Sequence, residues 1–98
     1  MTQYELFKKE CSAEVSEQGR DNELTRLSRS WMDRANSRKY SYHFEWMGRP
    51  IIQYPQDMIA MQEIIWEVKP DLIIETGIAH GGSLIFSAGM LELIAVCD

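Results

Sequence analysis

One run in the C-terminal half carries most of the information in this sequence: Leu72-Ile73-Ile74-Glu75-Thr76-Gly77-Ile78-Ala79-His80-Gly81-Gly82-Ser83-Leu84-Ile85-Phe86. It begins with a short apolar segment, typical of a strand buried on both faces of a parallel sheet. An acid, a glycine-rich turn and an apolar helix follow it. In open α/β sheets such a turn lies at the carboxyl ends of the strands, where ligands bind. The run therefore predicts an α/β fold with a binding site at residues 75–83.

The spacing within this turn favours one class of ligand over others. A phosphate-binding loop of the Walker type needs a lysine after its last glycine, and Gly82-Ser83 has none. The dinucleotide fingerprint is a poor match, because Gly77 is followed by glycine only at positions 81 and 82. The acid and glycine spacing is instead similar to the first motif of class I methyltransferases, which bind S-adenosylmethionine. Glu75 could then accept hydrogen bonds from the ammonium group of that ligand. A strand–helix connection that binds nothing is the alternative.

Apolar residues recur every three or four positions in three upstream segments, which predicts three amphipathic helices. The first two cover residues 4–18 and 22–38, and Asp21 or Asn22 can cap the second. The third begins at Pro55 and ends before Pro70, since proline is tolerated in a first turn and stops a helix later. Their apolar stripes are Tyr4, Phe7, Cys11 and Val15; Leu24, Leu27 and Trp31; and Met58, Met61, Ile65 and Val68.

Two further segments have a strand-like pattern. Aromatic residues alternate with polar ones from Tyr40 to Trp46, which predicts an extended segment with one aromatic face. That face is either packed on the core or forms the wall of a ligand pocket. After the helix that starts near Gly82, residues 95–97 are the one remaining candidate for a second strand. Asp98 stands close to the distance of about 20 residues expected for a ribose-binding acid, which we treat as coincidence because no loop precedes it.

Composition excludes several classes of protein. The 98 residues allow one domain, and the net charge of −5 argues against broad nucleic-acid binding. No apolar run approaches the roughly 18 residues that a transmembrane helix needs. The first residues lack the profile of a signal peptide, so a cytoplasmic location is expected. Cys11 and Cys97 have no metal-ligand spacing, so no metal site is predicted.

Charge is distributed unevenly along the chain. Residues 51–98 carry one Lys or Arg against seven Asp or Glu, whereas residues 20–49 carry seven against four. The basic stretch is either a solvated face or a docking surface for an acidic partner.

Two blocks of sequence resemble a known family. The first is residues 42–57, and the second combines residues 70–77 with Gly81-Gly82-Ser83. Together they are similar to the cephalosporin hydroxylase/rhamnosyl O-methyltransferase family, over about residues 38–94. The resemblance implies a Rossmann-like class I methyltransferase fold that uses S-adenosylmethionine. Members methylate hydroxyls of sugars, glycolipids or natural products, with a divalent metal such as Mg²⁺ in some.

The resemblance also assigns residues to the cofactor site. Those implied to bind S-adenosylmethionine are Glu75, Thr76, Gly77, Gly81, Gly82 and Ser83, with residues 54–57 beside the crevice. His80 is either a general base or a solvent-facing loop side chain, and no catalytic residue is identified. The expected organisation is a helical N-terminal segment at 1–38, followed at 39–98 by the start of the cofactor-binding domain.

Members of this family are longer, so we expect the 98-residue chain alone to be an inactive fragment. The expected partner is a small-molecule or glycan substrate, and no nucleic-acid partner is expected. The oligomeric state is left open and includes a homo-oligomer. One rival interpretation is an interaction module that completes a sheet with another chain. Another is a nucleotide-sugar-binding α/β enzyme such as a hydrolase.

Overall fold

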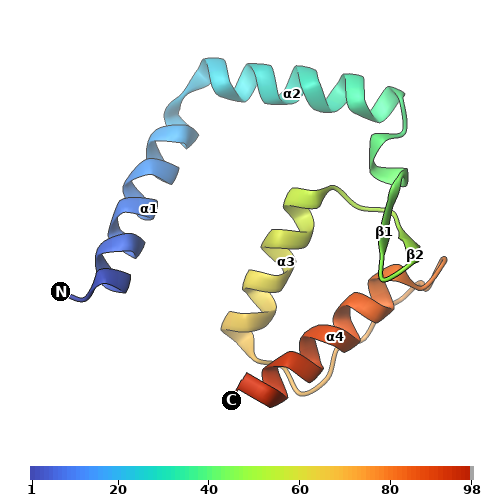
Figure 1. Cartoon of the computed structure of the whole chain (residues 1–98). Helices are drawn as coiled ribbons and strands as arrows, with labels where there is room; N and C mark the ends of the chain where they lie inside the picture. Colours follow the sequence, from blue (N-terminus) through green and yellow to red (C-terminus); the bar gives the residue numbers. More distant parts are fainter. Residues whose placement is uncertain (98) are drawn as a thin grey trace. The chain divides into compact units, whose positions relative to one another are not determined.

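The computed structural model describes residues 1–97. The chain forms two compact units, residues 1–37 and the residues from Arg38 onward, and each is described by itself. The first unit contains helices α1 (Gln3–Arg20) and α2 (Asn22–Ser37). The second contains a short 3₁₀ helix (Tyr40–Tyr42), strands β1 (Phe44–Trp46) and β2 (Arg49–Ile51), and helices α3 (Pro55–Val68) and α4 (Gly82–Cys97) (Figure 1). Among the described residues, none of the helices is long and apolar enough to cross a membrane.

Both helices of the first unit are capped by side chains at their N-termini. Thr2 and Glu5 form a capping box, in which each side chain accepts a hydrogen bond from the backbone N–H of the other. Asp21 Oδ1 accepts a hydrogen bond of 2.9 Å from the backbone N–H of Leu24, which confirms Asp21 as the cap of α2. No residue of α1 or α2 is buried, and both predicted apolar stripes are exposed except at half-buried Cys11.

Replacing this cap should weaken α2. Asp21→Ala leaves the N–H of Leu24 without its side-chain acceptor, and we expect a loss of about 1 kcal/mol of helix stability. Thermal melts followed by circular dichroism measure it. Asp33→Ala is the matched control, because an acid in the C-terminal half of α2 makes no favourable interaction with the helix dipole. Equal losses in the two variants would contradict the capping role.

The second unit is built around a β-hairpin that packs against α4. β1 and β2 are antiparallel, with Phe44 opposite Ile51 and Trp46 opposite Arg49. Met47 and Gly48 form the turn with φ values of 51° and 78°, which suits the twist of a two-residue hairpin. The buried core cluster consists of Ile51, Ile65, Phe86 and Ile94. It joins β2, α3 and α4, which lie close together in Figure 1.

The predicted extended segment at residues 40–46 is only partly correct. Residues 44–46 are a strand, but Tyr40–Tyr42 form a 3₁₀ helix. Lys39 precedes them in the left-handed conformation (φ 58°), which turns the chain. The Tyr40 ring then contacts the rings of Phe44 and Tyr54, with centroids 5.2 and 5.8 Å apart. Aromatic packing on neighbouring segments therefore replaces a continuous aromatic face.

The prediction of a buried parallel strand at residues 72–74 is wrong for the described part of the chain. The segment has no assigned strand partner among residues 1–97, and Leu72 and Ile74 are 72% and 80% exposed. Ile73 alone packs against the core. A parallel strand needs hydrogen-bonded neighbours and cover on both faces, and the sheet that does form is the antiparallel hairpin.

The candidate strand at residues 95–97 is also wrong, because α4 continues to Cys97. No proline or polar turn follows Gly89 to end this apolar helix. The described chain is thus a mixed α/β arrangement of four α-helices and a two-stranded sheet.

Candidate functional site

The acid and the serine of the predicted site are joined directly. Ser83 Oγ donates a hydrogen bond of 2.5 Å to Glu75 Oε1, which ties the segment after Ile74 to the first turn of α4. The other carboxylate oxygen, Oε2, is buried and has no hydrogen-bond partner among the described residues. A carboxylate at a helix N-terminus is favoured by the helix dipole. Glu75 is therefore fixed in place while keeping one oxygen available as an acceptor.

The backbone of the turn explains one of its glycines. Gly81 has a φ of 88°, in the left-handed region that favours glycine, and Ala79 has a φ of 48°. The N–H of Gly81 donates to the carbonyl of Ile78 at 2.8 Å, and the carbonyl of Gly81 accepts from Ile85 at 3.0 Å. The turn thus closes at Gly81 and passes directly into α4. Gly77 has no such conformation and no atom near its Cβ position, so this geometry does not require glycine there.

Gly82 has a packing role that the sequence did not indicate. A Cβ at this position would lie 2.4 Å from the carbonyl oxygen of Pro50 and 2.8 Å from the Cβ of Ile51. Glycine therefore lets the start of α4 approach β2 closely. Its predicted contact with a cofactor stays a prediction.

A cavity of about 180 Å³ lies beside Glu75. Its lining is mainly apolar, with the polar side chains of Glu75, Ser83, Ser87 and Gln53 at its wall. The remaining lining residues are Met61, Ile65, Ile73, Ile74 and Phe86. Of the predicted site residues, the structure brings Glu75 and Ser83 together here. Thr76 and Gly77 are exposed, Gly81 and Gly82 are buried, and none of these four lines the cavity.

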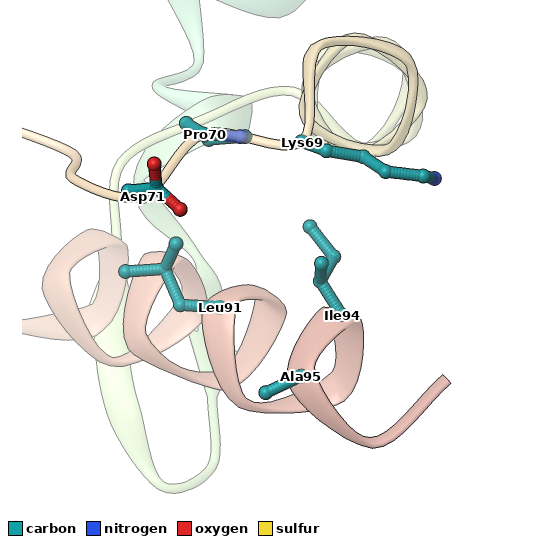
Figure 2. A pocket seen from close by; sticks show the side chains of 6 residues that line it. All are labelled: Lys69, Pro70, Asp71, Leu91, Ile94 and Ala95. Atoms are coloured by element: carbon teal, nitrogen blue, oxygen red, sulfur yellow. The ribbon is translucent and has the colours of Figure 1, made fainter. Parts of the chain in front are cut away.

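The remaining candidates lie apart from this cavity. His80 is exposed within the turn and does not line it. A second hollow has a volume of about 320 Å³. It lies between the residues that follow α3 and the C-terminal half of α4 (Figure 2). The ammonium of Lys69 at its edge lies 3.1 Å from the centroid of the Trp66 ring. No predicted site residue lines this hollow.

The hydrogen bond between Ser83 and Glu75 can be measured. We expect the single changes Ser83→Ala and Glu75→Ala to be coupled by about 1.5–3 kcal/mol, the range for a hydrogen bond to a charged group. Urea unfolding of both single variants and the double variant gives the coupling. Ser87→Ala, on the next turn of α4, is the control and should show little coupling to Glu75→Ala. Equal coupling for both serines would contradict the assigned bond.

Within residues 1–97, no group of three or more His, Cys, Asp or Glu side chains is placed to hold a metal ion. The polar groups that do converge at the cavity are the Glu75 carboxylate, two serine hydroxyls and the Gln53 amide, all of which can accept hydrogen bonds from a ligand.

Comparison with known proteins agrees with the motif. The model of the family described as "Rhamnosyl O-methyltransferase/CmcI" matches residues 38–97, which include the hairpin, α3, the turn and α4. The chain belongs to this family. The resemblance noted from the sequence is thereby confirmed.

A rhamnosyl O-methyltransferase of Mycobacterium leprae (strain TN) is 41% identical over 46 residues. The match covers 47% of this chain and 20% of that relative, so the chain spans about a fifth of the length of the curated relative it matches. No solved structure matches the chain.

Proposed function

We propose that residues 38–97 supply the first part of the S-adenosylmethionine site of an O-methyltransferase. Its acceptor is a hydroxyl on a sugar, a glycolipid or a natural product. Family membership and the name of the M. leprae relative support the reaction class. The observation that carries the proposal is the Glu75 carboxylate, held by Ser83 at the start of α4 with a second oxygen that has no hydrogen-bond partner within residues 1–97.

These residues fit the polar groups of the cofactor. The unengaged oxygen of Glu75 can accept a hydrogen bond from an ammonium or hydroxyl group. The first backbone N–H groups of α4 have no partner within the helix and can donate to a carboxylate. When bound, S-adenosylmethionine supplies an activated methyl group. The role of this chain is to hold the cofactor's polar end, and Gly81 allows the backbone to turn tightly there.

Two further assignments belong to this proposal. The 98-residue polypeptide by itself is proposed to be inactive in methyl transfer, because its match covers only a fifth of the relative's length. Residues 1–38 and 39–98 are proposed as a helical segment and the beginning of the Rossmann-like cofactor domain. We assign no residue of this chain to a divalent metal or to the general base.

Titration of the ¹⁵N-labelled chain with S-adenosylmethionine, followed by NMR, tests the proposal. We expect amide shifts concentrated at residues 75–83, with an affinity in the millimolar range. Glu75→Gln should weaken them several-fold, because a neutral amide holds an ammonium group less strongly than a carboxylate does. Glu63→Gln, an exposed acid on α3, is the matched control. Absence of shifts at 75–83, or equal effects of the two variants, would contradict the cofactor site. Micromolar affinity would contradict the idea that the pocket is only partly formed.

A second candidate function is an interaction module that completes a sheet with another chain. It is favoured by the segment at residues 72–75, which has no assigned secondary structure or strand partner within residues 1–97 and exposes Leu72 and Ile74. Size-exclusion chromatography with light scattering distinguishes the two. A defined oligomer that Ile74→Asp dissolves supports the module, whereas a monomer that binds S-adenosylmethionine supports the methyltransferase.

A further inference from the structure

Helix α2 has an exposed apolar face that none of the functions above uses. Leu24, Leu27 and Trp31 follow one another at spacings of three and four residues, which places them on one side of the helix. They are 42%, 51% and 47% exposed, and Met32 extends the face at 39%. No residue of α2 is buried in the structure. The face therefore presents aliphatic and indole surface over about two turns.

The same segment is cationic. Residues 20–39 contain six Lys or Arg against three Asp or Glu, which gives a net charge of +3 in a chain whose total is −5. Arg26 is paired with Glu23, with Nη2 2.6 Å from Oε1. Within residues 1–97, no ion pair engages Arg29 or Arg34. Arg20, Arg38 and Lys39 add positive charge just beyond the two ends of the helix.

An exposed apolar face together with a net positive charge favours one kind of binding partner, a membrane interface. On α2, Arg26 and Arg29 lie on the side opposite Leu24, Leu27 and Trp31, and Arg34 lies at the C-terminal end of the apolar row, three residues after Trp31. An apolar face with Leu and Trp, bordered and backed by Arg, on a helix of modest overall hydropathy is typical of helices that lie in a membrane interface. Arginine stems can cover apolar surface while their guanidinium groups reach lipid phosphates. A protein groove would accept the apolar face but gives no reason for the excess of positive charge. α1 offers the contrast, because its stripe is accompanied by four acids and three bases.

We propose that α2 binds the surface of a bilayer that contains anionic lipids. Leu24, Leu27 and Trp31 enter the boundary between headgroups and acyl chains, and Arg29 and Arg34 lie among the lipid phosphates. The helix lies along the surface and does not cross it. This would bring the chain to the surface where membrane-anchored substrates are found, but it holds whatever reaction the second unit serves.

Co-sedimentation of the full chain with vesicles tests the proposal. One set contains phosphatidylcholine with phosphatidylglycerol, and the other contains phosphatidylcholine alone. We expect binding to the anionic vesicles to be at least tenfold tighter, and to weaken when salt is raised, because exposed charges are screened over about 10 Å at 0.1 M salt. Equal binding to both vesicle sets, or binding that is insensitive to salt, overturns the proposal.

Variants on α2 separate the apolar and the charged contributions. Leu24→Ser with Leu27→Ser should reduce binding more than tenfold, since both aliphatic side chains lose their burial in the apolar part of the interface. Arg29→Gln with Arg34→Gln should reduce binding to anionic vesicles about 30-fold at low salt, from about 1 kcal/mol per charge. Circular dichroism checks that the helices persist. If the Leu24→Ser/Leu27→Ser variant has a lower helix content, the Arg29→Gln/Arg34→Gln variant still tests the proposal.

The matched control is the same change on α1, Tyr4→Ser with Phe7→Ser, two side chains that are 67% and 56% exposed. It should leave vesicle binding within about twofold, because neutral substitutions on α1 do not alter the charge or the stripe of α2. A loss equal to that of the α2 pair overturns the assignment to α2. Light scattering measures the oligomeric state of the chain. A dimer that the Leu24→Ser/Leu27→Ser change dissociates would show that a second copy of the chain covers this face, and it would also overturn the proposal.

Discussion

Phe86→Ala is expected to lower the free energy of unfolding of the second unit by about 3–5 kcal/mol, the range for truncation of a buried aromatic side chain. Phe86 is 5% exposed and belongs to the core cluster with Ile51, Ile65 and Ile94. The edge of one ring also meets the face of another, because the Phe86 and Trp46 centroids are 4.9 Å apart at an interplanar angle of 79°. The alanine would remove contacts with the hairpin and α3 at once.

The size of the unit makes this loss severe. A unit of about 60 residues buries a modest fraction of its surface and has little stability to lose. The variant should therefore be largely unfolded at 25 °C, with loss of the near-ultraviolet circular dichroism of packed aromatics such as Trp46. Phe7→Ala is the control, because Phe7 is 56% exposed on α1 and its truncation should cost less than about 0.5 kcal/mol. Similar stability in the two variants would show that Phe86 is not in the core.

Local patterns predicted the helices well because helix ends are determined by nearby residues. Asp21 caps α2 through the N–H of Leu24, three residues away. α3 begins at Pro55 and ends at Val68, two residues before Pro70. α4 begins at Gly82, where the sequence predicted a helix to start after the glycine-rich turn.

The strands were harder to predict because a strand depends on a partner elsewhere in the chain. Residues 72–74 have the apolar composition of a buried strand, but no neighbour pairs with them within residues 1–97. The hairpin was missed because its turn, Met47-Gly48, lacks the Asn-Gly or Asp-Gly sequence that indicates a two-residue turn. The left-handed conformation of Met47 cannot be predicted from its residue type, because methionine rarely adopts it.

In the candidate site, too, features set by nearby residues were predicted and those set by distant residues were missed. The spacing placed Glu75 and Ser83 in one region, and the structure joins them by a hydrogen bond. The contact of Gly82 with Pro50 comes from a strand more than thirty residues earlier, so no pattern in the turn could reveal it. The role of Gln53 and Met61 in lining the cavity was missed for the same reason.

Gly82→Ala is expected to lower the free energy of unfolding by about 1–3 kcal/mol, the range for overpacking a tight contact. The new Cβ would meet the carbonyl oxygen of Pro50 at 2.4 Å, and backbone cannot move aside as a flexible side chain can. β2 or the start of α4 must therefore shift. Urea unfolding followed by circular dichroism measures the change.

Gly89→Ala in the same helix supplies the matched control for this packing argument. Nothing lies within 4 Å of a Cβ at Gly89, so alanine should stabilise α4 by about 0.5–1 kcal/mol through its higher helix propensity. If glycine-to-alanine lowers the free energy of unfolding at the first residue of α4 but raises it in the middle of the helix, the difference is due to the contact with β2. A stabilising or neutral Gly82→Ala would refute the packing role and leave ligand approach as the reason for glycine. A destabilised Gly82→Ala that still shows the amide shifts with S-adenosylmethionine would assign Gly82 to packing alone.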